Sequence, residues 1–467
     1  MRATLILGGG PGGMGPLIHA AGTGALDSWL EAGVMLVERG ETLRGTLGRY
    51  LINSDSLGGA YLECLQSPHA QGVFGTVIGH SAATDLAAWR NSFPPLALVD
   101  AYLSRLGGSL RRALAARRPS GVLLQTQARA IHLRPKAGVL VELEGADGKI
   151  TFESARTVVV ALGGRPLAES SSLWRLPAEI SPDTIQPERV ISSDRLLTAE
   201  GLDHAAQLLA ASKVKRVVVI GGSHSAFSSA WVLTRHLPRG TFAPGGIVLL
   251  ARGQPRIFYE SLAAAAADGY AASEADVCPR TERVNRFAGL RGDGREMWRS
   301  ITRRPGATAD PRIELALLDG QDFQRARLQP LFDEAALIVL ATGYRSRTVP
   351  VYDQRGNRLQ LMADQDGPAA GPDARLLQAN GEPLDDVFSI GLGNGFRPSE
   401  SMGGEPSFAG QANSLWLYQN DIGAAVWRGV RESTGLAAPN QRWTAAFDQL
   451  RASSSGSVQA EPVEVAP

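Results

Sequence analysis

Cysteine is nearly absent from this chain, which has only Cys64 and Cys278 among its 467 residues. The two are far apart and form no CxxC pair, which argues against a redox-active disulfide and against a zinc site built from cysteines. Seven histidines are present, but none shows the spacing of metal ligands. We therefore expect two isolated thiols, no metal site and a reducing, cytoplasmic environment.

Long apolar runs and an excess of one charge are also missing. No uncharged stretch of about 18 apolar residues occurs, and residues 4–8 are too short an apolar run for a secretory signal. Lys plus Arg number 47 and Asp plus Glu number 46, so the net charge is +1. The chain thus has no excess of positive charge with which to bind nucleic-acid phosphates. We expect no membrane and no nucleic-acid partner, a small-molecule substrate, and an oligomeric state that the sequence leaves open.

Glycine, at 53 residues, is abundant and marks two βαβ units. The first has an apolar run over residues 4–7, a glycine-rich turn, a helix, and a second apolar run over residues 33–37. Gly8, Gly10 and Gly13 fit GxGxxG, the turn whose backbone and helix N-terminus bind a pyrophosphate. Glu38 closes the unit as an acceptor for ribose hydroxyls. It follows Gly8 by 30 residues, several more than usual, and we place the surplus in residues 21–25.

The second unit has its first apolar run at residues 216–220, a helix that reaches Leu237, and a second run at residues 246–250. Its turn consists of residues 221–226, and we expect the nucleotide ligands there and just beyond: Gly221, Ser223, His224, Ser225, Ala226 and Arg252. Ser223 replaces the middle glycine, so it either hinders a pyrophosphate or donates a hydrogen bond to it. Arg252 follows the second strand, where a guanidinium selects a 2′-phosphate, although an ordinary exposed arginine is the alternative.

Other segments complete an α/β chain. Alternating patches at residues 139–143 and 150–152 predict a small antiparallel element. Apolar runs at residues 157–161 and 336–340, each followed by a glycine turn, predict buried parallel strands. Residues 50–56 and 398–406 are polar, glycine-punctuated loops beside these elements, where functional residues tend to lie. The tail, residues 452–467, has too few apolar residues to pack, and we expect it to be disordered.

The order of these motifs resembles the class B flavin monooxygenases, particularly their ornithine and lysine N-hydroxylase branch. The similarity covers most of residues 1–430 and includes Ala341-Thr342-Gly343-Tyr344 and the closing segment 387–394. It implies a fold of two Rossmann-like domains: a discontinuous FAD-binding domain at residues 1–170 and 345–450, and an inserted NAD(P)H-binding domain at residues 190–344. FAD then binds the first motif and the closing segment with Gly391, and NADPH binds the insert. His224 stands where glutamine is frequent and is expected to help place the cofactor.

The resemblance also implies an activity, an NADPH-dependent monooxygenation. One oxygen atom passes from a flavin hydroperoxide to a nucleophilic N, S or C centre, with N-hydroxylation favoured. The cofactor performs the difficult chemistry, so no catalytic triad is expected, and the catalytic residues stay unknown. Asn53, Asp55 and Asn394 are the candidates to lie near the flavin.

The sequence departs from the family at two places. Ile191 stands where histidine is common, and the lysine-bearing segment that engages amino-acid substrates has no match. Two alternatives therefore stay open. Ser223 motivates an FAD-dependent oxidase or dehydrogenase with a vestigial NAD(P)H domain, and the other alternative is a flavin-binding sensor without catalysis.

Overall fold

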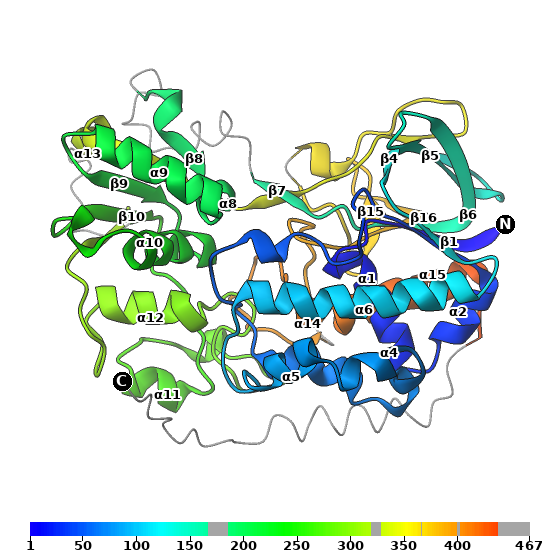
Figure 1. Cartoon of the computed structure of the whole chain (residues 1–467), viewed down its shortest axis with the longest axis horizontal. Helices are drawn as coiled ribbons and strands as arrows, with labels where there is room; N and C mark the ends of the chain where they lie inside the picture. The colour runs from blue at the N-terminus through cyan, green and yellow to red at the C-terminus, as the bar shows by residue number, and fades with distance from the viewer. Residues whose placement is uncertain (167–184, 319–327, 366, 399–401, 438–467) are drawn as a thin grey trace.

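The chain folds into two halves that lie side by side (Figure 1). The computed structural model describes residues 1–166, 185–318, 328–365, 367–398 and 402–437. The tail at residues 452–467, expected to be disordered, lies outside the described residues. Within these ranges no helix is long and apolar enough to cross a membrane.

The first half is built on a nine-stranded sheet with the order β14-β4-β5-β6-β1-β2-β3, in which β16 also pairs with β6 and β15 with β16. Strands β3, β2, β1, β6 and β16 run parallel, and β4, β5 and β6 form the expected antiparallel element. The strands are β1 (Arg2–Leu7), β2 (Val34–Val37), β3 (Gly121–Leu123), β4 (Thr126–Arg134), β5 (Gly138–Gly145), β6 (Ile150–Val160), β14 (Val351–Tyr352), β15 (Arg375–Leu377) and β16 (Pro383–Ser389).

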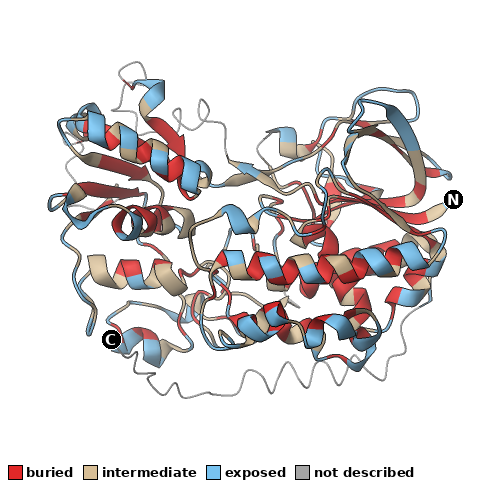
Figure 2. Cartoon of the chain, viewed as in Figure 1, coloured by how far each residue is buried: buried red, intermediate tan, exposed pale blue. Residues whose placement is uncertain are grey.

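Both faces of the parallel part are buried, which explains its continuous apolar runs. In β1, Ile6 packs into the core beneath the helices, while Leu5 and Leu7 pack into a second core on the opposite face. In Figure 2 the long helix α6 has a buried side and an exposed side. The helices of this half are α1 (Pro11–Gly22), α2 (Leu26–Ala32), α3 (Gly58–Leu62), α4 (Gln71–Ile78), α5 (Ser81–Ala87), α6 (Leu96–Ala116), α14 (Leu415–Gln419) and α15 (Asp421–Thr434).

The second half has a five-stranded parallel sheet with the order β11-β10-β9-β12-β8. Val217 and Val219 of β9 face one core and Val218 faces another, so this sheet is also covered on both faces. Its elements are β8 (Val190–Ser192), β9 (Arg216–Ile220), β10 (Ile247–Ala251), β11 (Ile313–Leu317), β12 (Ala335–Leu340), α8 (Ser193–Leu196), α9 (Ala199–Ala211), α10 (His224–His236), α11 (Leu262–Ala267), α12 (Gly292–Ile301) and α13 (Leu328–Glu334).

The chain passes between the halves through a two-stranded antiparallel ribbon, β7 (Gly164–Pro166) with β13 (Tyr344–Ser346). Both strands follow the glycine turns that end β6 and β12, the two buried parallel strands expected from the sequence. One detail of the first unit was wrong. The surplus residues between Gly8 and Glu38 are not a loop at residues 21–25, because α1 continues to Gly22 and α2 fills most of the remaining length.

Candidate functional site

A cavity of about 890 Å³ runs from the first glycine turn to the boundary between the two halves. It opens at the carboxyl ends of β1, β2 and β6, where open α/β sheets bind their ligands. Its volume lies in the range of cofactor and ligand sites. Its lining includes Gly8, Gly10, Glu38, Asp55, His224 and Gly391.

The three glycines of the first motif are needed for three different reasons. Gly8 has φ +107° and a Cβ atom there would lie 2.3 Å from the carbonyl oxygen of Ala161, so the turn itself requires glycine. At Gly13 a Cβ atom would lie 1.9 Å from the carbonyl oxygen of Gly8, because helix packs on strand here. Gly10 is different. Its Cβ atom would meet no described protein atom closer than the Cα of Gly45, at 3.4 Å, and would point into open cavity. That space fits a pyrophosphate held at the start of α1.

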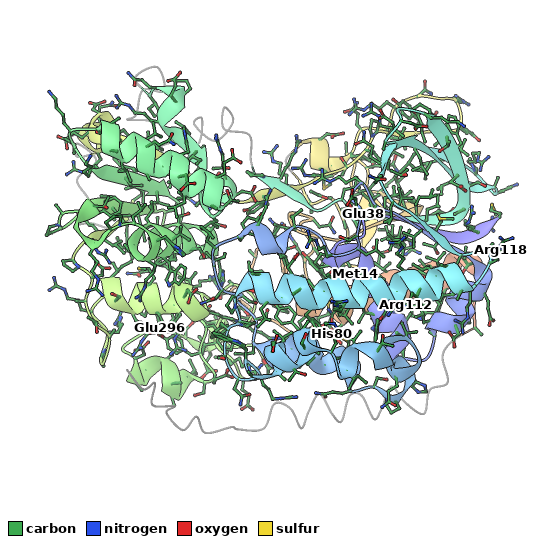
Figure 3. All side chains as sticks on the ribbon, viewed as in Figure 1. Met14, Glu38, His80, Arg112, Arg118 and Glu296 are labelled. Carbon is green, nitrogen blue, oxygen red and sulfur yellow. The ribbon has the colours of Figure 1, made fainter. Side chains whose placement is uncertain are left out.

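Glu38 fixes the shape of this turn. Its Oε2 accepts a hydrogen bond from the Gly9 amide at 2.6 Å, and its Oε1 accepts one from the Gly40 amide at 2.7 Å. Figure 3 labels Glu38 above Met14 of α1 in this view. Each carboxylate oxygen keeps a lone pair for a ligand, so the contacts are compatible with the ribose-binding role expected for this residue.

The closing segment after β16 also reaches the cavity. Gly391 has φ +137° and lines the cavity, and a Cβ atom at Gly12 of α1 would lie 3.2 Å from the carbonyl oxygen of Ile390. Asn394 does not line the cavity. Its amide is used within the segment, where Oδ1 accepts from Ser389 Oγ at 2.6 Å and Nδ2 donates to the Ser389 carbonyl at 2.7 Å. Asn394 therefore holds the turn together.

Asn53 and Asp55 both line the cavity at its far end. Asn53 Nδ2 donates to Asp293 Oδ1 at 3.2 Å, so a residue of α12 in the second half holds this side chain. The Asp55 carboxylate is exposed in the cavity. The structure thus brings two of the three flavin-proximal candidates together.

The second glycine turn has the same construction at the end of β9. Gly221 has φ +149° and a Cβ atom there would lie 2.4 Å from the carbonyl oxygen of Ala341, and Ala226 is fully buried against the sheet. Ser223 is the N-cap residue of α10, yet its exposed hydroxyl makes no capping hydrogen bond and stays available to a ligand. Ser225 follows it in the first turn of α10. Arg252 is exposed directly after β10.

His224, at the start of α10, faces the cavity of the first half. Its Nε2 is buried and has no hydrogen-bond partner among the described residues. Burial lowers the pKa of His224; the charge of Asp55 opposes this shift, and that of Arg291 adds to it. The imidazole is therefore neutral near pH 7 and has a ring nitrogen free to bond a ligand.

A cluster of four hydrogen-bonded side chains, which the sequence did not predict, joins the two halves beside the cavity. Asp194 of α8 accepts from Tyr50 Oη at 2.5 Å, Arg49 Nη2 at 2.7 Å and Tyr344 Oη at 3.3 Å. Burial, followed by the bond to Asp194, raises the pKa of Tyr50 to about 12, so the phenol stays a donor. Tyr50 and Tyr344 stand in segments that the sequence singled out, but no spacing rule shows that these side chains converge on Asp194.

Each half has parallel strands that lead into a glycine turn at a helix N-terminus, and a cavity lies where the halves meet. This is the construction of a protein with two Rossmann-like dinucleotide-binding domains. The residues fit two dinucleotides. Gly10 leaves space for the pyrophosphate of one, and the Nε2 atom of His224 can hydrogen-bond to the other. Within the described ranges no three or more His, Cys, Asp or Glu are grouped to hold a metal ion.

Comparison with known proteins gives the family. The CMP-5′-(3-aminopropyl)phosphonate hydroxylase of Streptomyces rubellomurinus (strain ATCC 31215) is 33% identical over 437 residues, covering 92% of this chain and 97% of that hydroxylase. The chain therefore belongs to this hydroxylase's family. As a member of a hydroxylase family, it is an enzyme that acts on a small molecule. No protein-family model matches the chain.

Solved structures agree on the fold. Ornithine hydroxylase from Pseudomonas aeruginosa has a TM-score of 0.53 at 14% identity, with 91% of this chain and 99% of that chain covered. The cadaverine monooxygenase of desferrioxamine biosynthesis from Erwinia amylovora, solved with FAD, has a TM-score of 0.53 at 13% identity, with both chains covered fully. At these identities the likeness concerns the fold alone.

Proposed function

We propose that residues 1–170 and 345–450 hold FAD and that residues 190–344 hold NADPH. In this assignment FAD contacts Gly8, Gly10, Gly13, Glu38 and Gly391, and NADPH contacts Gly221, Ser223, His224, Ser225, Ala226 and Arg252. The free hydroxyl of Ser223 favours a working nucleotide site over the vestigial one of an oxidase or dehydrogenase, and a family of hydroxylases does not favour a sensor. Two buried free thiols and a balanced charge support a cytoplasmic enzyme without nucleic-acid partners.

One observation carries this proposal. The cavity that begins at Gly10 is also lined by His224 and Ser228 of α10, four residues and thus one helical turn apart. The first glycine turn would hold FAD at one end of this cavity, and His224 and Ser228 would face the nicotinamide of NADPH at the other. Bound FAD, once reduced by NADPH, supplies an oxygen atom taken from dioxygen. The protein needs only to align the partners and limit water around them.

For the substrate, we infer a primary amine that also carries phosphonate or phosphate groups, such as CMP-5′-(3-aminopropyl)phosphonate. An arginine-rich segment supports this choice, because residues 280–304 contain eight arginines against three acidic residues. Arg286 and Arg291 form no ion pair with any residue in the described part of the chain. Arg291 stacks on Phe258, 4.1 Å from the ring centroid, and is positioned close enough to Asp55 for their charges to interact.

The test is an assay with FAD-loaded enzyme, NADPH and air. Three amines are compared: CMP-5′-(3-aminopropyl)phosphonate, 3-aminopropylphosphonate and ornithine. We expect a product one oxygen atom heavier from a phosphonate amine, with close to one product per NADPH consumed. If ornithine is hydroxylated while both phosphonates only release hydrogen peroxide, the substrate assignment is wrong.

A further inference from the structure

The loop that carries Asp55 is pinned on both sides of this residue. The Ser54 amide donates to the Pro94 carbonyl at 2.8 Å, and the buried Ser54 hydroxyl lies 2.5 Å from Tyr61 Oη. The Ser56 amide in turn donates to Ser54 Oγ at 2.9 Å. The backbone on either side of Asp55 is thus fixed, although Asp55 itself contributes little to fixing it.

The Asp55 carboxylate is left almost without partners. It accepts one long hydrogen bond, from Ser56 Oγ at 3.3 Å, and it forms no ion pair with any residue that the structure describes. The groups that face it are Tyr61, Tyr418 and His224, all lining the cavity, and Arg291. Burial raises the pKa of both tyrosines and lowers that of His224, so these three are neutral. Arg291 is held elsewhere, over Phe258 and by its bond to the Arg286 carbonyl at 2.5 Å.

Asp55 is thus an exposed carboxylate without an ion pair among the described residues, on a pinned loop at the end of the cavity, and its one cationic neighbour, Arg291, is held by other groups. Such a carboxylate is suited to a cationic ligand. Resting on the proposed function, we propose that Asp55 binds the ammonium group of the substrate and removes its proton. An ammonium nitrogen has no lone pair, so it must lose a proton before it can form an N–O bond. The N–H bond breaks, its electron pair stays on nitrogen, and the proton passes to the Asp55 oxygen and from there to solvent.

The first experiment measures binding to the oxidised, FAD-loaded protein without NADPH. Calorimetry compares the wild type with Asp55→Asn, using CMP-5′-(3-aminopropyl)phosphonate and its analogue CMP-5′-propylphosphonate, which lacks the amine. Asp55→Asn is expected to raise the Kd of the amine at least tenfold, since a charge-assisted bond is lost, and to leave the Kd of the analogue unchanged. A merely structural role would weaken both ligands equally.

Turnover gives the second test. In Asp55→Asn we expect kcat/KM for the amine to fall about a hundredfold, NADPH to reduce the flavin within twofold of the wild-type rate, and electrons to be diverted to hydrogen peroxide. Asp55→Glu restores part of the activity, and Asp85→Asn, an exposed carboxylate on α5, serves as the control without effect. Hydroxylation by Asp55→Asn with unchanged kcat/KM overturns the Asp55 proposal alone. A wild-type enzyme that ignores the amine overturns the substrate assignment, and the proposal fails with it.

Discussion

At the scale of single residues, Gly10 is the position where the chain leaves space for a ligand. Gly10→Ala adds a methyl group that touches only Gly45, so the apoprotein should melt within a few degrees of the wild type. The same methyl group occupies the pyrophosphate cradle, and FAD affinity should fall at least tenfold. The absorbance of bound flavin and the melting temperature of the apoprotein measure the two effects.

Gly13→Ala is the matched comparison for Gly10→Ala. Its methyl group would overlap the Gly8 carbonyl, so this variant should be destabilised even as the apoprotein, without FAD. A Gly10→Ala protein that purifies with a full complement of FAD would contradict the assignment of the first motif.

His224 gives the site a defined pH dependence. Burial lowers the pKa of His224 in the folded protein below the ordinary 6.5, so the unfolded chain binds the proton more readily. Above about pH 6.5 His224 therefore does not lower the free energy of unfolding. As the pH falls from there toward the lowered pKa of the folded protein, the destabilisation by His224 grows. His224→Gln should reduce the loss of melting temperature between pH 7.5 and 5.5, whereas His204→Gln on α9 should not. Equal losses in all three proteins would count against the neutral, buried imidazole.

The sequence predicted individual residues where a backbone rule applies. Gly8, Gly13 and Gly221 follow from turn geometry and helix packing, and Glu38 follows from the end of β2. Asn394 was a candidate to lie near the flavin, but its amide bonds to Ser389 within the turn, because an asparagine beside a glycine turn bonds nearby chain groups as readily as a ligand. Convergence of Asp194 with Tyr50 and Tyr344 was unpredictable, because it brings together positions nearly 300 residues apart.

At the scale of elements, α6 packs against a loop that lines the cavity, and two adjacent glycines of this helix have different surroundings. Gly107 faces the loop of residues 43–48, where a Cβ atom would lie 1.8 Å from the Leu43 carbonyl oxygen. Gly108 faces outward, and its nearest neighbour would be Arg112 Nη1 at 3.9 Å. Gly108→Ala should stabilise the protein by about 0.5–1 kcal/mol through helix propensity.

Gly107→Ala gains the same propensity but must displace the loop that lines the cavity, so it should cost about 1–3 kcal/mol and weaken FAD binding. Denaturant titrations of the two variants, with flavin release as a second signal, separate the effects. Similar stabilities for both would show that the loop adjusts freely. Elements such as α6 were less visible in the sequence than the strands, since an amphipathic helix has no motif, and α2 directly follows the segment 21–25 to which the surplus residues were assigned.

At the scale of the whole molecule, the insertion of a parallel sheet into a larger mixed sheet follows from the sequence, because two βαβ units and two glycine-ended strands fix the crossing points. The way the halves face each other does not follow, since it depends on contacts such as Asn53 with Asp293 that join residues 240 positions apart. That arrangement decides whether one cofactor reaches the other.

Ser228 offers a way to test this arrangement, because it lines the cavity from α10 and belongs to the second half. Ser228→Trp should fill the space between the halves without touching the first glycine turn. Under anaerobic conditions dithionite should bleach the flavin of this variant as fully as that of the wild type, whereas NADPH should reduce it at least tenfold more slowly. The visible spectrum during each titration gives the result. If NADPH bleaches the variant at the wild-type rate, hydride reaches the flavin by a route other than the face of α10, and the cavity between the halves serves the substrate instead.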